Sequence, residues 1–185
     1  DSTVNFMARA AHCEVMPIDI GMQFPTPGGV YAQKLMPGTN DMFYVSAMSR
    51  HTCIRAIEAG MALARQQAQA GTDILLLGEM GIGNTTTSAA VASVLLGRPA
   101  ETLAGRGAGL SDEGLQRKIH VIARAINVNR PNPVDPVDVI SKVGGLDLAA
   151  LCGVCLGGIK YRVPVPEVLH YGRNNFQRYQ STYHP

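Results

Sequence analysis

The chain has 185 residues, of which 46% are apolar and 16% are charged, and its formal net charge at pH 7 is +2. This length allows one substantial core, and the composition is typical neither of a disordered segment nor of a nucleic-acid-binding domain. The longest mainly apolar runs, 74–77 and 91–96, are far shorter than the roughly 20 residues of a membrane span.

The first 40 residues predict half of an α/β unit followed by a long loop. Apolar residues at helical spacing predict a helix over 2–12, whose buried side would carry Val4, Met7, Ala8 and Ala11. Residues 14–20 are typical of a strand, and the prolines and glycines of 21–40 predict a loop.

A second unit combines a long helix with a buried strand. Ser49 is a suitable N-cap for an amphipathic helix, and Gly71 is suited to the left-handed backbone that follows a helix end. The continuous apolar run over 73–77 predicts a strand covered on both faces, as in a parallel sheet. An alanine-rich helix over 85–96 follows, and its apolar sides predict burial.

Further helices are predicted in the second half of the chain. One begins near Ser111, with acidic residues in its first turn and an apolar stripe of Leu115, Ile119, Ile122 and Ile126. A proline-rich break over 127–136 separates it from short helices over 136–142 and 146–157. Asp135 and Asp138 flank Pro136, so we interpret them as helix-capping residues rather than an acid–base pair.

The alternation of strands and helices predicts an α/β fold with a doubly wound, mostly parallel sheet. In such sheets ligands bind beyond the carboxyl ends of the strands, which is where the loop after 73–77 lies. Residues 161–185 hold five of the ten Phe and Tyr residues without any helical or strand period. We therefore expect this stretch to be poorly ordered or foreign to the fold.

The four cysteines are too few for a disulfide scaffold, so we expect a reducing, cytoplasmic setting. Cys152 and Cys155 form a C-x-x-C inside an apolar helical stretch, without a second pair or a histidine cluster. We interpret them as buried small residues and expect neither a metal site nor a cofactor.

The loop over 78–84 predicts an anion site. Gly78, Gly81 and Gly83 allow close backbone approach, and the following helix start offers free N–H groups. Asn84, Thr85 and Thr86 add side-chain donors, whereas Glu79 carries the wrong charge for phosphate and should face a cationic or N–H-bearing part of a substrate. A turn that only lets strand and helix pack is the alternative, since neither the Walker motif nor the dinucleotide fingerprint is present.

A second glycine cluster, 105–109, precedes the helix that carries Lys118. At about 100° per residue Lys118 lies at the border of the apolar stripe, so its ammonium group can reach from the core edge toward a phosphate. An ordinary solvated lysine is the alternative.

Three ordered segments carry a resemblance to a known family. GEMGIGNTT (78–86), GRGAGLSDEGLQRK (105–118) and KVGGLDLAALCG (142–153) resemble the nicotinate-nucleotide:dimethylbenzimidazole phosphoribosyltransferases of cobamide (cobalamin) biosynthesis. The resemblance continues upstream through VNFMAR (4–9), VMPIDIG (15–21) and SAMSR (46–50), and it covers about residues 2–165.

The resemblance implies a glycosyltransferase that moves the phosphoribosyl group of nicotinate mononucleotide to a nitrogen of 5,6-dimethylbenzimidazole or a related base. The products would be α-ribazole phosphate and nicotinate. It further implies a Rossmann-like α/β domain with a smaller helical domain, usually a homodimer, whose partners are these small molecules rather than nucleic acid or membrane.

The resemblance also implies roles for the loop residues. Glu79 would lie beside the base and nicotinate sites and favour the positive charge that develops at C1′. The other implied substrate contacts are Gly78, Met80, Gly81, Asn84, Thr85 and Thr86 along the nucleotide, and Gly105, Gly107 and Lys118 at the phosphate.

The sequence departs from the family pattern at both ends. The family's opening segment is absent before Asp1, and so is its closing segment with the glutamate that acts as general base. We expect a nucleotide-binding core over 1–165 and a divergent, truncated or frame-shifted tail over 166–185. The alternative function is a non-catalytic remnant that binds nucleotide or nothing.

Overall fold

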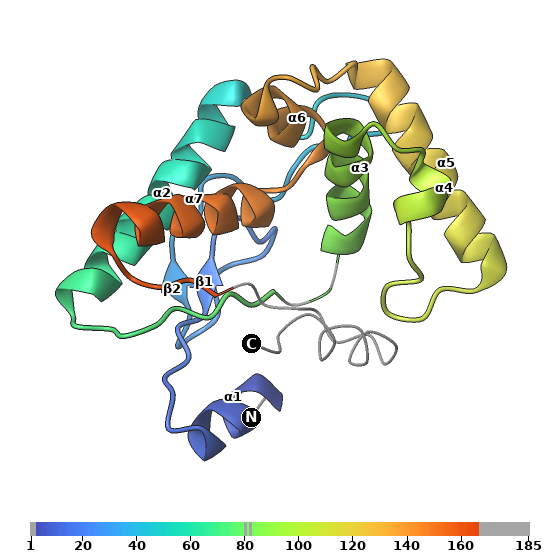
Figure 1. Ribbon diagram of the computed structural model, residues 1–185. Helices are drawn as coiled ribbons and strands as arrows, with labels where there is room; N and C mark the ends of the chain where they lie inside the picture. Colours follow the sequence, from blue (N-terminus) through green and yellow to red (C-terminus); the bar gives the residue numbers. More distant parts are fainter. Residues whose placement is uncertain (1–2, 80, 82, 167–185) are drawn as a thin grey trace, which may run out of the picture.

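A computed structural model describes residues 3–79, 81 and 83–166 of the chain. The expected tail over 166–185 lies outside the described residues except for Pro166. Within the described part the elements follow the order α1 (Thr3–Ala10), β1 (Ile18–Asp19), β2 (Tyr31–Ala32), α2 (Arg50–Gln69), α3 (Asn84–Leu96), α4 (Ala100–Leu103), α5 (Asp112–Asn129), α6 (Pro136–Val143) and α7 (Leu146–Tyr161). In Figure 1, α2 and α7 lie on one side of the molecule, α3, α4 and α5 lie on the other, and α1 stands apart below them.

The fold is α/β with a small parallel sheet. β1 pairs with β2 in parallel, with Ile18 opposite Tyr31 and Asp19 opposite Ala32. The predicted strand over 14–20 is thus reduced to two residues. The predicted strand over 73–77 is wrong, because Leu75 N donates a backbone hydrogen bond of 2.9 Å to Pro164 O but no ladder forms in the described part of the chain. Ile74 and Leu76 are accordingly exposed rather than covered on two faces.

The helix predictions are largely confirmed, including their ends. Ser49 caps α2 by accepting a hydrogen bond from Thr52 N, and Gly71 follows the helix with a φ of 81°. Ser111 caps α5 in the same way through Gly114 N. Both caps satisfy backbone N–H groups that the first turn of a helix leaves without partners.

Two burial expectations are wrong, and a third is confirmed only in part. α1 forms, but it has no buried residue, and Val4 and Met7 on its predicted inner side are exposed, because the helix stands apart from the other helices (Figure 1). α3 is only partly buried, since Leu96 at its end is exposed. Cys152 and Cys155 are exposed on α7 rather than buried.

Helices α2 and α7 approach each other through glycines. A Cβ added at Gly60 of α2 would overlap the carbonyl oxygen of Ala150, and one added at Gly153 of α7 would overlap that of Ile57. A Cβ at Gly157 would lie 2.6 Å from the Cβ of Ala64. The glycines therefore set the distance between the two helices, because side chains there would push the helices apart.

The core consists of two apolar clusters that share helix α6. The first cluster contains Val139 and Val143 of α6 together with residues of α3, α4 and α5. The second contains Ile140 of α6 together with residues of α2 and α7. Because neighbouring positions of one short helix point into different clusters, α6 fixes the α2–α7 pair relative to the α3–α5 group.

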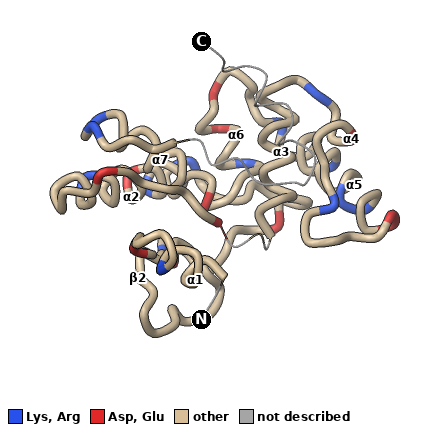
Figure 2. Tube along the Cα trace, turned by 60° about the horizontal axis from the view of Figure 1, so that its bottom comes forward, with Lys and Arg blue, Asp and Glu red and all other residues tan. Residues whose placement is uncertain are grey.

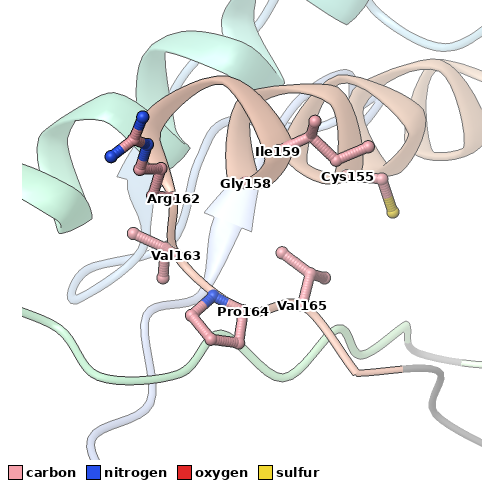
Figure 3. Close-up of a pocket in the computed structure, with 7 residues that line it drawn as sticks. All are labelled: Cys155, Gly158, Ile159, Arg162, Val163, Pro164 and Val165. Carbon is pink, nitrogen blue, oxygen red and sulfur yellow. The ribbon is translucent and has the colours of Figure 1, made fainter.

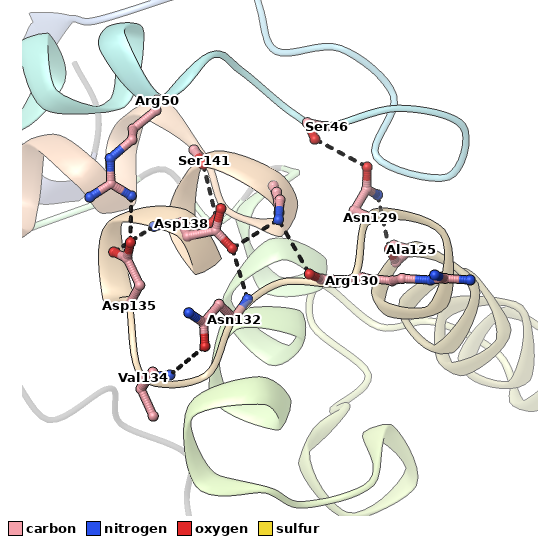
Figure 4. A network of polar contacts seen from close by, with 11 residues as sticks. Ser46, Arg50, Ala125, Asn129, Arg130, Asn132, Val134, Asp135, Asp138 and Ser141 are labelled. Atoms are coloured by element: carbon pink, nitrogen blue, oxygen red, sulfur yellow. Dashed lines mark hydrogen bonds and ion pairs between the residues drawn. The ribbon is translucent and has the colours of Figure 1, made fainter.

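A polar network fixes the start of α6 (Figure 4). Asp135 is the N-cap, accepting a hydrogen bond from Asp138 N at 3.1 Å and pairing with Arg50 at 2.7 Å. Asp138 accepts from Asn132 N and pairs with Lys142 one turn later at 2.9 Å. The prediction of helix capping is confirmed for Asp135, whereas Asp138 lies inside α6 and binds the preceding loop instead.

The loop after β1 is organised around a buried carboxylate. Asp19 is only 1% exposed and accepts hydrogen bonds from Gly21 N, Met22 N and the hydroxyl of Thr26, and it pairs with Lys34 at 3.2 Å. Burial acts to raise the pKa of Asp19, but the hydrogen bonds from Thr26, Met22 and Lys34 outweigh it, so the pKa is lowered. The ionised carboxylate thus holds the loop that leads to β2.

We predict that Gly153→Ala lowers the free energy of unfolding by about 3 kcal/mol, because the new methyl group overlaps the backbone of α2. Gly28→Ala is the matched control, since an added Cβ there meets nothing within 4 Å, and its effect should stay within about 1 kcal/mol. Chemical denaturation followed by circular dichroism measures both. Equal effects of the two substitutions would contradict the glycine contact.

We predict that the contribution of Asp19 to stability is lost at acidic pH. Its folded pKa lies below the ordinary value of 3.8, so the contribution is complete above that value and disappears as the pH falls through the folded pKa. Asp19→Asn should cost about 1–3 kcal/mol at neutral pH, because the amide places a donor among donors. Denaturation between pH 7 and pH 2 should show a smaller loss on acidification in the variant than in the wild type.

Candidate functional site

The glycine-rich loop adopts the backbone that its sequence predicts. Gly81 has a φ of 78°, and Gly83, the N-cap of α3, has a φ of 84°. Residues with side chains rarely adopt such angles, so these two positions require glycine. Gly83 offers no side chain to cap α3, so the first N–H groups of this helix receive no bond from their N-cap residue, and a helix start of this kind suits an anion.

Glu79 bends back onto this loop. Its Oε2 atom accepts a hydrogen bond from Gly81 N at 2.5 Å, and the residue is exposed. The carboxylate therefore lies beside the backbone just before α3 and stays accessible from outside. Met80, which was also predicted to contact substrate, lies outside the described residues.

Lys118 is the central cation of the site. It lies on α5, is 6% exposed, and donates hydrogen bonds of 2.9 Å from Nζ to Thr85 Oγ1 and to Gly105 O. Burial lowers the pKa of Lys118. The alternative of an ordinary solvated lysine is therefore wrong, while the predicted reach toward a phosphate stays a prediction.

The second glycine cluster packs against the first turn of α3. Gly107 has a φ of 55°, and a Cβ added there would lie 3.0 Å from Thr85 Oγ1. Gly105 supplies the carbonyl that binds Lys118. The structure thus brings together Thr85, Gly105, Gly107 and Lys118 from three separate segments of the chain.

The remaining predicted residues lie along the same loop and helix start. Asn84 and Thr86 are half-buried, and Gly78 is exposed. The Oδ1 atom of Asn84 is buried and has no hydrogen-bond partner among the described residues. Because an unsatisfied buried acceptor is costly, it fits a ligand that donates an O–H or N–H group at this point.

Positive and negative residues are interspersed along the described chain trace (Figure 2). With a net charge of only +2, the chain as a whole would attract an anion weakly, so local groups matter more. Within 3–79, 81 and 83–166 no group of three or more His, Cys, Asp or Glu residues is arranged to hold a metal ion. No helix there is long and apolar enough to cross a membrane.

A hollow of about 390 Å³ lies at the end of α7, and its lining includes none of the predicted site residues (Figure 3). Its lining consists of Cys155, Gly158, Ile159, Arg162, Val163, Pro164 and Val165. Cys155 and Val165 face the open space, whereas the guanidinium of Arg162 points away from it. No sequence pattern indicated this hollow, because it depends on how residues 163–165 return along the helix.

The chemistry of the loops therefore favours an anion over a metal. Free N–H groups at the start of α3 and the ammonium of Lys118 are donors, and a phosphate accepts from both kinds of group. The carboxylate of Glu79 repels that anion and suits a centre that becomes positive.

Comparisons with known proteins agree with this chemistry. The family model described as phosphoribosyltransferase matches residues 1–166. A nicotinate-nucleotide–dimethylbenzimidazole phosphoribosyltransferase of Ruminiclostridium cellulolyticum is 44% identical over 164 residues, which are 88% of this chain and 46% of the relative. Another of that name from Desulforudis audaxviator is 43% identical over the same length.

Solved structures give the same answer. A crystal structure of CobT from Thermus thermophilus superimposes with a TM-score of 0.81 and 38% identity, covering 89% of this chain and 50% of that one. The chain thus spans about half the length of the curated relatives and of the solved structure that it matches.

We predict that Thr85→Val destabilises the protein by about 1–3 kcal/mol, because the buried ammonium of Lys118 loses one of its two acceptors. Thr85→Ser keeps the hydroxyl and should retain most of the stability. Urea denaturation of the two variants measures the difference. If Thr85→Val were as stable as the wild type, the hydrogen bond to Lys118 would not contribute to stability.

Proposed function

Because the chain belongs to the phosphoribosyltransferase family, we propose that it transfers the phosphoribosyl group of nicotinate mononucleotide to 5,6-dimethylbenzimidazole. In this reaction the bond from C1′ to the pyridine nitrogen of nicotinate breaks, and a bond from C1′ to a benzimidazole nitrogen forms. Nicotinate leaves, the benzimidazole N–H proton passes to a base, and α-ribazole phosphate is the product. The product would provide the lower ligand of cobalamin and related cobamides.

The observation that carries the proposal is the position of Lys118. Its buried ammonium group lies between Thr85 and the carbonyl of Gly105, next to the free start of α3. We assign the phosphate of the nucleotide to this point, where Gly105, Gly107 and Lys118 would surround it. A phosphate there would supply the negative charge that Lys118 lacks among the described residues.

We assign the ribose and bases to the loop over 78–86. Asn84 Oδ1 would accept a hydrogen bond from a ribose hydroxyl, which gives this orphaned atom a partner. Thr85 and Thr86 would contact the nucleotide, with Gly78, Met80 and Gly81 along the loop. Glu79 would act on the reacting centre, since a carboxylate beside C1′ stabilises the positive charge that develops as nicotinate departs.

The organisation of the whole protein is part of the proposal. We infer a Rossmann-like, doubly wound arrangement for the family fold, with residues 1–165 as the nucleotide-binding core and 166–185 as a divergent tail. Homodimer formation and a cytoplasmic setting follow from the same family resemblance. The match of the family model over 1–166 supports the boundary of the core.

The test is a direct assay of the chain with nicotinate mononucleotide and 5,6-dimethylbenzimidazole, with α-ribazole phosphate detected by mass spectrometry. Formation of the product supports the proposal. Absence of product together with thermal stabilisation by the nucleotide would identify a binding protein that does not catalyse. Absence of both would refute the nucleotide site.

We predict that Lys118→Ala weakens the binding of nicotinate mononucleotide about 30-fold or more, because a charge-assisted contact to phosphate is lost. Binding of 5,6-dimethylbenzimidazole, which has no phosphate, should change little. Calorimetric titration with each ligand separates the two effects. An equal loss for both ligands would show that the variant damages the site as a whole.

A further inference from the structure

The loop between the second glycine cluster and α5 is closed by one arginine. The carbonyl oxygen of Arg106 accepts hydrogen bonds from Gly109 N at 3.2 Å and Leu110 N at 3.0 Å. Its guanidinium donates from Nη1 to Leu110 O at 2.9 Å and pairs through Nη2 with Asp112. Backbone and side chain of Arg106 therefore both tie the loop to the start of α5.

The two residues on either side of Arg106, Gly105 and Gly107, both contact residues of the candidate site. Gly105 supplies the acceptor for Lys118, and Gly107 lies against Thr85. Gly107 and Gly109 have φ angles of 55° and 103°, so the segment is rich in residues that lose much entropy when ordered. Asp112, by contrast, lies in the first turn of a capped helix and is a fixed point.

We propose that Arg106 is a positioning residue, which holds the Gly105–Gly107 backbone in the geometry that binds the nucleotide phosphate. This inference rests on the proposed function for the identity of the ligand. Arg106 acts through Asp112 and the carbonyl of Leu110 and keeps these partners when the nucleotide is bound. It contributes by reducing the entropy that the loop would otherwise lose on binding.

A direct role for Arg106 as a second phosphate-binding cation makes the opposite prediction for Asp112. If the guanidinium left Asp112 to reach the phosphate, Asp112→Asn would release it and leave nucleotide affinity unchanged or raise it. If Arg106 positions the loop, Asp112→Asn weakens the clamp and lowers affinity. The sign of this one effect separates the two roles.

The experiment measures nicotinate mononucleotide affinity by calorimetry for wild type, Arg106→Gln and Asp112→Asn. We expect a loss of about five-fold in each variant, the size typical of losing one exposed ion pair with its hydrogen bond. Arg50→Gln is the matched control, because Arg50 is 52% exposed in its pair with Asp135 and Arg106 is 53% exposed in its pair with Asp112. The control should leave affinity unchanged.

Hydrogen exchange of the backbone amides over 105–110, without ligand, gives a second readout that does not depend on the reaction. We expect faster exchange in Arg106→Gln and Asp112→Asn and no change in Arg50→Gln. Unchanged exchange in both loop variants, or an unchanged or raised affinity in Asp112→Asn, would overturn the positioning role. If wild type bound no nucleotide, the proposed function would fail, while the exchange data would still decide whether the clamp exists.

Discussion

A buried ammonium group with only neutral partners is the constraint on which the candidate site depends. Lys118 is withdrawn from water, and its two acceptors are a threonine hydroxyl and a backbone carbonyl. No carboxylate pairs with it in the described part of the chain. Burying a charge without an opposite charge is costly, and burial accordingly lowers its pKa. An anion bound beside Lys118 would reduce this cost, which is why we propose an anion at this point.

The packing of the helices makes that arrangement possible. α3 and α5, which carry Thr85 and Lys118, belong to the first apolar cluster. α6 joins this cluster to the α2–α7 pair, whose closeness depends on glycines at the contact. The α2–α7 pair is therefore held by close contacts between helix backbones. The candidate site lies on the other side of α6, with α3 and α5.

The sequence predicted the helices, their ends and the positive φ angles of Gly81 and Gly83 well, because these features depend on neighbouring residues. Ser49 and Asp135 cap helices as predicted, and α5 starts at Ser111, near which its start was predicted, since a helix start is decided within one turn. The strand over 73–77 was predicted wrongly because a strand depends on a partner distant in sequence, and apolar composition alone does not supply one. The predictions that α1, Cys152 and Cys155 are buried were wrong for the same reason, because burial also depends on contacts with residues distant in sequence. Two features gave no periodic signal in the sequence. One is the clamp of Arg106 on Asp112, and the other is helix α4.

The extended segment over 73–77 has a consequence for handling the protein. It presents apolar side chains at Ile74 and Leu76, and Leu75 N is tied to Pro164 O without a ladder around it in the described part of the chain. An open extended edge of this kind is a template for pairing between molecules, and a run of isoleucine and leucine without charge is typical of segments that aggregate. Pairing through this segment would increase with protein concentration, and a more stable helical core would not prevent it.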